Sequence, residues 1–397
     1  NRFGIFTGLI TVVKNVSLTV GVSDKISMKF STSKTELHQA LQKLSKATPT
    51  RSTLPILGCA LIEAKEEKTT LRATDLEITI QAEIPVSLEQ AGTAALPLKT
   101  LLDITNEMPE TRLTLSVDEK NRATITTDTG EYDLMAKPAE EFPAIPDQKG
   151  SNSIKTSGSL LKEIIDATSF AVSRDELKPA LTGVFFQISP TGITAVATDG
   201  HRLVKYSRKD FGSNGFSGDL IVPKKFLIYM STQLLNQDTE LIIGDNHLTA
   251  KIDNDFVLTR IIDERFPDYE SVIPKENDKT LKAEKDMLLG AIRRVSIFSN
   301  KSTHQVALSM DGDSCRITTE DPEKSSKANE TVAADYEGND LTIGYNAEYL
   351  KDVVNHVPGK TVVVEFSTPI SAALFSSELT EDHIESLMLL MPIRLND

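Results

Sequence analysis

Apolar residues recur along the chain at spacings of three and four, which is the spacing of one face of an α-helix. Ser33 and Glu36 form a capping-box pattern in front of such a stripe, so a helix is predicted over about residues 34–47. The stripe of this helix consists of Leu37, Leu41 and Leu44. Two further stripes have the same spacing: Leu160, Ile164 and Ala167, and then Leu288, Ile292 and Val295.

A second helix is predicted about 60 residues after the start of each of these three. These helices are expected to begin near Pro97, Pro223 and Asn346. Proline suits the first turn of a helix, where its missing N–H has no intrahelical partner to lose. Between the helices apolar and polar residues alternate with period two, which is typical of strands that bury one face. Hairpins are predicted for 112–117 with 123–127 and for 241–243 with 248–252.

The order helix, strands, helix, strands is accompanied by repeated sequence motifs. The segment Ala195-Val-Ala-Thr-Asp-Gly-His-Arg-Leu-Val204 has a degenerate copy 124 residues upstream, Leu71-Arg-Ala-Thr-Asp-Leu-Glu-Ile78. The pairs Phe142-Pro143 and Phe266-Pro267 have the same offset, and a third, fainter copy is Ile317-Thr-Thr-Glu-Asp321. The chain is therefore interpreted as three copies of one domain of about 120 residues, an array of domains rather than a solenoid.

Length and composition agree with this interpretation. A chain of 397 residues suffices for three domains that each bury a core, and 39% hydrophobic with 25% charged residues is typical of globular proteins. We predict an α+β fold with domains at residues 28–149, 150–278 and 279–397. The two cysteines, Cys59 and Cys315, belong to different repeats, which favours a reducing compartment, and Cys59 is expected in the core of a strand at 57–62.

Residues 1–27 precede the first repeat and require a separate interpretation. The stretch from Phe3 to Val22 is apolar, with Lys14 as its only charge, but it has no convincing small-residue cleavage site. Polar residues interrupt it too often for a good membrane span. We interpret it as a misassigned start or a vector-derived leader rather than an export signal or an anchor.

Charge is unevenly distributed along the chain, whose net charge is −14. The six helical segments (35–48, 96–109, 158–178, 222–234, 286–302 and 345–358) together carry +2, so the remaining residues carry −16. If the helices share one face, that face could lie against a polyanion while the rest of the surface repels it. Lys and Arg are also good helix formers, however, and the sequence leaves both explanations open.

Motifs for catalysis or for cofactor binding are poor. The chain lacks a Gly-rich phosphate loop, a His-Glu-x-x-His motif and a Cys-x-x-Cys motif, and its six histidines show no metal-ligand spacing. No cofactor and no metal are expected. Asp199 and His201 would be the base and its orienting partner of a hydrolase, but Asp and Gly at 199–200 equally suit a turn. A non-catalytic three-repeat scaffold is the other alternative.

Four motifs, in this order, resemble a known family. They are Thr53-Leu-Pro-Ile-Leu-Gly58, Ala197-Thr-Asp-Gly-His-Arg-Leu203, Arg265-Phe-Pro-Asp-Tyr269 and Met391-Pro-Ile-Arg-Leu395. They are similar to the bacterial sliding clamp, the beta subunit of DNA polymerase III, over residues 28–395. The resemblance implies a non-catalytic processivity factor in the cytoplasm, associated with the nucleoid during replication. It also implies a head-to-tail homodimer, in which six clamp-type domains of two helices on antiparallel sheets form a ring around double-stranded DNA without sequence specificity.

The resemblance further implies an apolar cleft between the second and third domains for short peptides of the polymerase, the clamp loader and repair polymerases. No membrane is involved. Ser271 and Ala372 depart from relatives that have a longer basic and a hydroxyl side chain there. The matching positions combine apolar walls with polar groups: Leu181, Thr198, Gly200, His201, Arg202, Leu203, Pro267, Val272, Asn346, Tyr349, Ile370, Leu389, Met391 and Pro392.

Two further sets of residues follow from the resemblance and from charge. By family match the dimer interface is expected at Tyr132 and Leu134 on one side and at Ile297 and Phe298 on the other. Arg51, Arg174 and Lys178 match family positions near DNA. Helix charge alone adds four more cations, for which solubility is an equally good explanation: Lys224, Lys225, Arg293 and Arg294.

Overall fold

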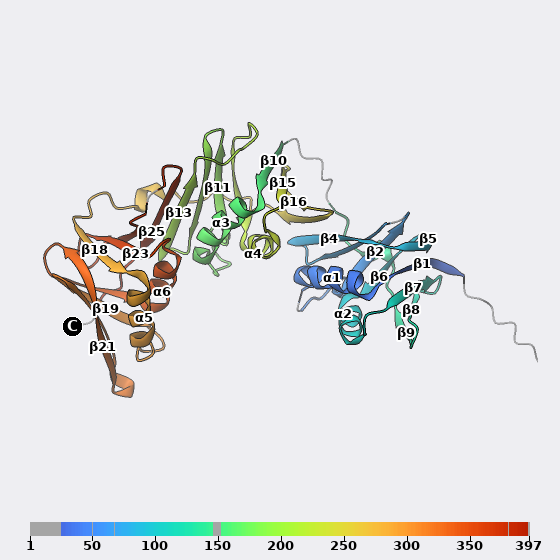
Figure 1. Ribbon diagram of the computed structural model, residues 1–397, viewed down its shortest axis with the longest axis horizontal. Helices are drawn as coiled ribbons and strands as arrows, with labels where there is room; N and C mark the ends of the chain where they lie inside the picture. Colours follow the sequence, from blue (N-terminus) through green and yellow to red (C-terminus); the bar gives the residue numbers. More distant parts are fainter. Residues whose placement is uncertain (1–24, 50, 67, 146–151, 380, 396–397) are drawn as a thin grey trace, which may run out of the picture.

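The chain forms three units arranged in an arc, seen in a computed structural model that describes residues 25–49, 51–66, 68–145, 152–379 and 381–395 (Figure 1). The leader predicted for residues 1–27 lies, up to residue 24, outside the described residues. Residues 26 and 27 are part of the fold, because strand β1 begins at Ile26 and the Ser27 hydroxyl donates to the Val117 carbonyl (3.0 Å). Strand β1 thus begins two residues before residue 28, at which we predicted the first domain to start.

Each unit contains two helices and two sets of strands. The first unit consists of β1 (Ile26–Ser33), α1 (Lys34–Leu44), β2 (Cys59–Lys65), β3 (Lys68–Thr74), β4 (Ile78–Pro85), β5 (Ser87–Gln90), β6 (Gly92–Pro97), α2 (Leu98–Glu107), β7 (Arg112–Asp118), β8 (Arg122–Thr126) and β9 (Glu131–Met135). The second consists of β10 (Asn152–Ser157), α3 (Gly158–Thr168), β11 (Gly183–Ser189), β12 (Gly192–Thr198), β13 (Arg202–Arg208), β14 (Gly218–Pro223), α4 (Lys224–Gln233), β15 (Asp238–Ile243), β16 (His247–Ile252) and β17 (Asp255–Arg260).

The third unit repeats this order with a longer central strand. Its elements are β18 (Lys279–Glu284), α5 (Lys285–Ser296), β19 (Gln305–Asp311), β20 (Ser314–Asp321), β21 (Ser326–Glu337), β22 (Leu341–Asn346), α6 (Ala347–His356), β23 (Thr361–Phe366), β24 (Ala373–Ser377) and β25 (Ile384–Leu390). The faint third motif, at 317–321, lies on β20, which corresponds to the motif strands β3 and β12. The threefold repetition predicted from sequence is confirmed.

Most of the predicted elements are present. Helices α2, α4 and α6 begin one residue after Pro97, Pro223 and Asn346, and the Ser33 hydroxyl accepts the N–H of Glu36 at the start of α1. The apolar stripe predicted for α3 is displaced by about one residue from the face that the structure buries. Leu161, Ile164, Ile165 and Thr168 are buried, whereas Leu160 and Ala167 are only partly buried. Cys59 is buried as expected, but its strand starts there, because residues 55–58 form a 3₁₀ turn.

The sheets continue from one unit into the next. A sheet of eight strands runs from the second unit into the first, because β17 pairs with β4 in antiparallel register, Phe256 opposite Gln81 and Thr259 opposite Ile78. A sheet of twelve strands runs from the third unit into the second, because β25 pairs with β13, Leu390 opposite Arg202 and Ile384 opposite Arg208. The units are thus joined by main-chain hydrogen bonds as well as by side chains.

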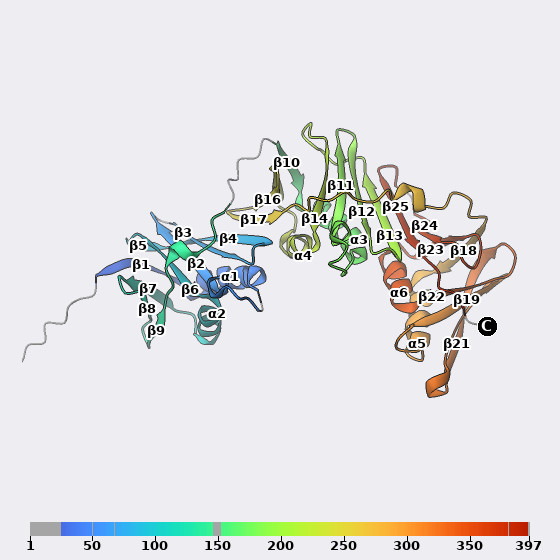
Figure 2. The same cartoon turned by 180° about the vertical axis from the view of Figure 1, so that it is seen from behind.

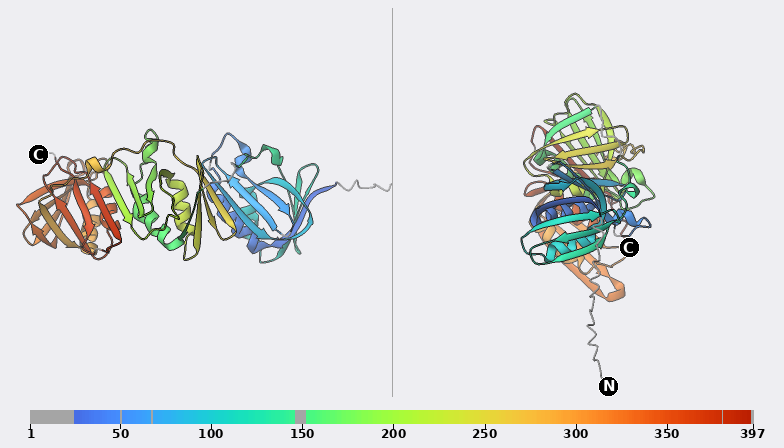
Figure 3. Two further views of the ribbon diagram at one scale, coloured as in Figure 1. Left: turned by 90° about the horizontal axis from the view of Figure 1, so that it is seen from above. Right: turned by 90° about the vertical axis from the view of Figure 1, so that its right-hand side faces the viewer.

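The arc has a helical inner side and a sheeted outer side. The six α-helices of the described residues lie toward the concave side, and the strands form the convex side (Figures 1 and 2). Seen from above, the units lie in one row, with the first and third at opposite ends (Figure 3). The hairpin of β20 and β21 projects from the third unit beyond its neighbours (Figure 1). No helix in the described part of the chain is long and apolar enough to cross a membrane.

Candidate functional site

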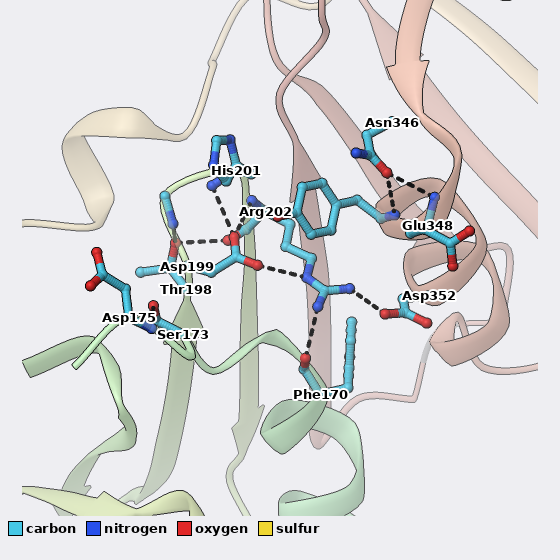
Figure 4. A network of polar contacts seen from close by, with 12 residues as sticks. Phe170, Ser173, Asp175, Thr198, Asp199, His201, Arg202, Asn346, Glu348 and Asp352 are labelled. Carbon is cyan, nitrogen blue, oxygen red and sulfur yellow. Dashed lines mark hydrogen bonds and ion pairs between the residues drawn. The ribbon is translucent and has the colours of Figure 1, made fainter. Parts of the chain in front are cut away.

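The repeated Thr-Asp motif forms a tight turn at each of the two junctions between units. At 198–202 the Asp199 carboxylate accepts the N–H groups of His201 (2.9 Å) and Arg202 (3.0 Å), and the Thr198 hydroxyl donates to the Arg202 carbonyl (2.7 Å; Figure 4). Gly200 takes a positive φ of 89°, a conformation that glycine adopts without strain. Asp and Gly therefore serve the turn, as the sequence indicates.

The upstream copy forms the same turn with different side chains. The Asp75 carboxylate accepts the N–H groups of Glu77 (3.1 Å) and Ile78 (2.9 Å), and the Thr74 hydroxyl donates to the Ile78 carbonyl (3.0 Å). Leu76 has a positive φ of 78° where the second copy has Gly200. The turns at the two junctions thus have the same hydrogen-bond pattern. Of the two turns, that at 198–202 contains glycine, histidine and arginine.

Arg202 links the second unit to the third. Its side chain is buried, and its guanidinium donates to Asp199 (3.1 Å), to Asp352 on α6 (2.7 Å) and to the Phe170 carbonyl (3.0 Å). Figure 4 shows the guanidinium at the centre of these contacts. The guanidinium carbon also lies 4.9 Å from the centre of the Tyr349 ring, within the range of a cation–π contact. The charge of Arg202 is thus satisfied from both units.

Aromatic rings extend this contact across the junction. Phe170, just after α3, stacks on His356 at the end of α6 with ring centres 3.7 Å apart. His201 stacks on Tyr349 with ring centres 5.4 Å apart and an interplanar angle of 17°. Asn346 caps α6 by accepting the N–H groups of Glu348 (2.9 Å) and Tyr349 (3.4 Å), so it fixes the first turn on which Tyr349 lies.

An apolar cluster lies beside this network. Leu203 and Leu389 are opposite each other in the β13–β25 pairing and are both buried. Phe266 and Tyr269 of the duplicated Phe-Pro region belong to the same cluster, and Leu181 packs against it. The cluster takes residues from the second and third units, so apolar side chains of two repeats meet at one surface.

Three large apolar side chains around this cluster are exposed. Val272 is 55% exposed, Ile370 66% and Met391 43%. The backbone of Met391 is held, because its N–H donates to the His201 carbonyl (2.8 Å). Pro267 is exposed, while Pro392 is half-buried. We call this surface, with the fourteen residues predicted for the cleft, the junction site.

Contacts across this junction join His201, Arg202 and Leu203 of the second unit to Tyr349, Leu389 and Met391 of the third. Sequence reasoning missed Phe170, His356 and Asp352, which complete the Arg202 network. A single sequence gives no sign that residues 202 and 352 are in contact. Their contact follows from the way the second and third units meet, with β13 paired to β25.

The predicted DNA-facing cations differ in their surroundings. Arg51, Arg174 and Lys178 are exposed. Lys224 is half-buried at the start of α4, where burial, and then the nearby charges of Arg174 and Arg202, lower its pKa.

The three remaining cations contact acceptors on the protein. The ammonium group of Lys225 contacts Asp75 of the first unit. Arg294 is bonded through both arms of its guanidinium to Glu330 on β21, with 3.1 Å for Nε, and Arg293 reaches Asn355 at 3.4 Å. Lys225 and Arg294 are therefore ion-paired residues in this structure.

The residues predicted for the dimer interface lie at the two ends of the arc. Tyr132 (37% exposed) and Leu134 are on β9, and Leu134 is half-buried. Ile297 (68% exposed) and Phe298 (46% exposed) follow α5. The main-chain carbonyl of Phe298 accepts the Ser326 hydroxyl at the start of β21 (3.2 Å), which places this pair beside that strand.

Asp199 and His201 do not form the base and orienter of a hydrolase in this structure. Both carboxylate oxygens of Asp199 are taken up by the turn and by Arg202, and its contact with residue 201 is to the main-chain N–H. Among the described residues, no group of three or more His, Cys, Asp or Glu side chains is arranged to hold a metal ion.

Comparison with known families covers nearly the whole fold. The three described domains of the DNA polymerase III beta subunit match in order: the N-terminal domain at residues 28–146, the central domain at 155–268 and the C-terminal domain at 270–394. The third match begins at residue 270, ahead of β18.

Individual relatives match over the same range. The beta sliding clamp of Vibrio cholerae is 31% identical over 373 residues, which is 93% of this chain and 100% of that protein. The beta sliding clamp of Escherichia coli K12 is 30% identical over 372 residues, with the same coverage. Among solved structures, the sliding clamp of Pseudomonas aeruginosa bound to griselimycin has 28% identity and a TM-score of 0.86, and that of Bacillus subtilis has 27% and 0.88. Each of these two matches covers 93% of this chain and 100% of the chain in the solved structure.

Proposed function

The chain belongs to the beta sliding clamp family, the beta subunit of DNA polymerase III, and we propose that two copies close head to tail into a ring that encircles duplex DNA. In this form it serves as a processivity factor, because a polymerase tethered to a closed ring does not leave the DNA between steps of synthesis. A head-to-tail contact that closes after two copies leaves no free end.

Two open strand edges support the ring. Within the described chain, β9 pairs only with β8, and the first half of β21, residues 326–333, pairs only with β20. By their order in the repeat, β9 corresponds to β17 and β25, and β21 corresponds to β4 and β13. These corresponding strands pair with each other at both internal junctions. A third junction, from β9 of one copy to β21 of the next, would use the same pairing and cover two edges that otherwise invite association.

The residues proposed for the seam fit this pairing. Tyr132 and Leu134 have the same offset of 124 from Phe256 and Leu258, which are buried on β17 at the first internal junction. Ile297 and Phe298 follow α5 much as Phe170 follows α3, and Phe170 stacks on His356 across the second junction. We therefore propose that Ile297 and Phe298 pack against the partner beside β9.

Duplex DNA would pass along the concave, helical side. Arg51, Arg174, Lys178, Lys224 and Arg293 are its proposed contacts, and Lys225 and Arg294 would first have to give up their carboxylate partners. The helices carry +2 while the remainder carries −16, which supports a lining that tolerates phosphates inside a surface that repels them. Such contacts with phosphates carry no sequence information.

The junction site is the proposed docking point for short peptides of the replicative polymerase, the clamp loader and repair polymerases. Exposed Val272, Ile370 and Met391 would cover apolar side chains of the peptide, and His201 would contact its backbone or a polar side chain. The commitment of Asp199 to its turn supports a role in binding without catalysis. The proposed location is the cytoplasm, and the two buried, unpaired thiols of Cys59 and Cys315 are compatible with it.

The ring is tested by its seam. Replacing Ile297 by Ala and Phe298 by Lys together should convert dimers into folded monomers, because a lysine in an apolar contact replaces the side chains expected to dominate its energy. Mass from light scattering after size exclusion, with circular dichroism as the check on folding, measures this. A matched control is Met287→Ala, at an exposed apolar position of the same helix α5. A double variant that remains dimeric at nanomolar concentration would overturn the proposed seam.

A further inference from the structure

A cavity of about 1030 Å³ lies between the second and third units. It is lined by Ser159 at the start of α3, by residues 234–236 after the end of α4 and by residues 357–359 after the end of α6. The junction site lies at the first turn of α6 and beyond the end of α3, and His356 borders both sites, because it lines the cavity and stacks on Phe170. We call this cavity the second opening, because the same two units form it.

The second opening has exposed apolar walls. Leu235 is 69% exposed and Leu379 is 73% exposed, and both line the cavity. Leu379 lies over Gly359, where an added Cβ would come within 3.0 Å of its Cδ1. Gly359 also has a φ of 78°, a conformation that glycine adopts without strain. Leu235 and Leu379 thus expose apolar surface at the mouth of the cavity, which an apolar side chain of a partner would cover.

The charges around the leucines are predominantly negative. Four carboxylates line the cavity against two ammonium groups: Glu163, Asp166, Glu381 and Glu385 against Lys162 and Lys285. Both lysines have internal partners. Lys285 donates to the Val357 carbonyl (2.9 Å), and Lys162 donates to Asp166 (2.7 Å) and Ser231 (2.9 Å).

The carboxylates at the rim are less completely neutralised. Glu381 lies 3.3 Å from the imidazole of His383, which also lies 3.8 Å from Asp210. Glu385 is 3.7 Å from Lys205, whose ammonium is closer to Glu270, at 3.0 Å. Both glutamates are about 60% exposed, at 63% and 61%. A cation placed in the opening would therefore meet two exposed carboxylates that share their partners with other carboxylates.

We infer that the second opening binds a short segment of a partner protein that presents a leucine-like side chain next to lysine or arginine. The apolar side chain would cover Leu235 and Leu379, and the cation would reach Glu381 and Glu385.

The probe is a fluorescein-labelled peptide that alternates leucine and arginine, titrated into the full-length dimer and followed by fluorescence anisotropy. The expected dissociation constant is on the order of 100 μM, as befits a short flexible ligand in an open pocket. The double variant Leu235→Asp with Leu379→Asp should bind it at least about tenfold more weakly. The control variant is Leu76→Asp, at another exposed leucine (58%) at a different junction, and it should bind like the parent.

Several results would overturn the inference. One is equal binding of a peptide with glutamate in place of arginine, since charge would then play no part. Another is unchanged binding by the Leu235/Leu379 variant, or displacement of the probe by duplex DNA or by a saturating junction-site peptide. Self-association of the parent dimer that the Leu235/Leu379 variant abolishes would make the occupant a second copy of this chain. If no titration saturates at millimolar peptide, the opening does not bind this class of ligand.

Discussion

Arg202 is a buried cation whose three acceptors come from both sides of a junction between units. Its removal leaves Asp199, which is 11% exposed, without its main side-chain partner, whereas Asp352, at 51%, returns to water. Arg202→Ala should therefore cost about 2–3 kcal/mol, less than the loss of a fully buried ion pair. The measurement is the urea midpoint by circular dichroism, with Arg293→Ala as the control at an exposed arginine. Equal midpoints for both variants would contradict this role for Arg202.

Met391 provides a side chain to the junction site while its backbone is held by His201. Because the Met391 N–H donates to the His201 carbonyl, truncation of the side chain should leave the chain path intact. Met391→Ala should weaken the binding of a polymerase tail peptide about fivefold to tenfold, the loss expected for a partly buried apolar side chain. Loader peptides should weaken in parallel because they share the site.

The control for this experiment is Met287→Ala, which is 58% exposed on α5 and distant in sequence from the site. Anisotropy titrations with both peptides, on protein shown to be dimeric, measure how much Met391 contributes to peptide binding. Unchanged binding of both peptides to Met391→Ala would remove Met391 from the site.

Residue patterns predicted some parts of the junction site and not others. The Thr-Asp-Gly turn could be predicted, because its geometry depends on contacts within five residues. The apolar members were named by family match, since Leu181, Val272 and Ile370 individually look like ordinary core. The acceptors of Arg202 could not be predicted, because Asp352 is 150 residues away and depends on how two units pair.

At the scale of elements, a substitution in the edge strand β9 can test the proposed seam without unfolding the first unit. Main-chain bonds from Thr127 to Gly130 and from Ala136 to Asn121 fix the β8–β9 ladder, so the N–H groups of Tyr132 and Leu134 point to β8. The N–H of Asp133 points to the open edge. Asp133→Pro should therefore remove a hydrogen bond across the proposed seam and favour monomers, while β8 and β9 remain paired.

The matched control is Leu134→Pro, which removes an N–H inside the ladder and should destabilise the first unit itself. Sedimentation velocity gives the dimer fraction, and thermal unfolding separates the two effects. Asp133→Pro should dissociate with little change in unfolding temperature. If it dissociates no more than the parent does, β9 is not an edge of the seam.

Helices were predicted more accurately than their buried faces. Capping residues and prolines determine where a helix starts, and these local signals were correct for α1, α2, α4 and α6. The face of α3 was displaced because Leu160, Leu161, Ile164 and Ile165 are all apolar, so two adjacent stripes fit the same periodicity. Packing against the sheets buries Leu161 and Ile165 in addition to Ile164. That choice depends on tertiary contacts, which periodicity does not contain.

For the whole molecule, the number of units could be predicted from repeated motifs, but their connection could not. A period of 124 residues and a common element order require three similar domains. The continuous sheets depend on β17 finding β4 and β25 finding β13, pairings between strands more than 170 residues apart. The same rule, applied to β9 and β21, would turn the arc into the proposed ring when a second copy is present.

A closed ring and an open arc should respond differently to salt once they are on DNA. Contacts between side chains and phosphates weaken steeply as salt rises, because binding releases counterions, whereas enclosure does not depend on those contacts. Protein loaded on a nicked circle by a clamp loader should therefore remain through a wash in about 1 M salt that strips it from linear DNA. Cutting the retained circle with a restriction enzyme should release it. The Ile297/Phe298 double variant serves as the control, since monomers should be lost from both substrates. Equal loss of the parent protein from circular and linear DNA would show that it is held by charge rather than by topology.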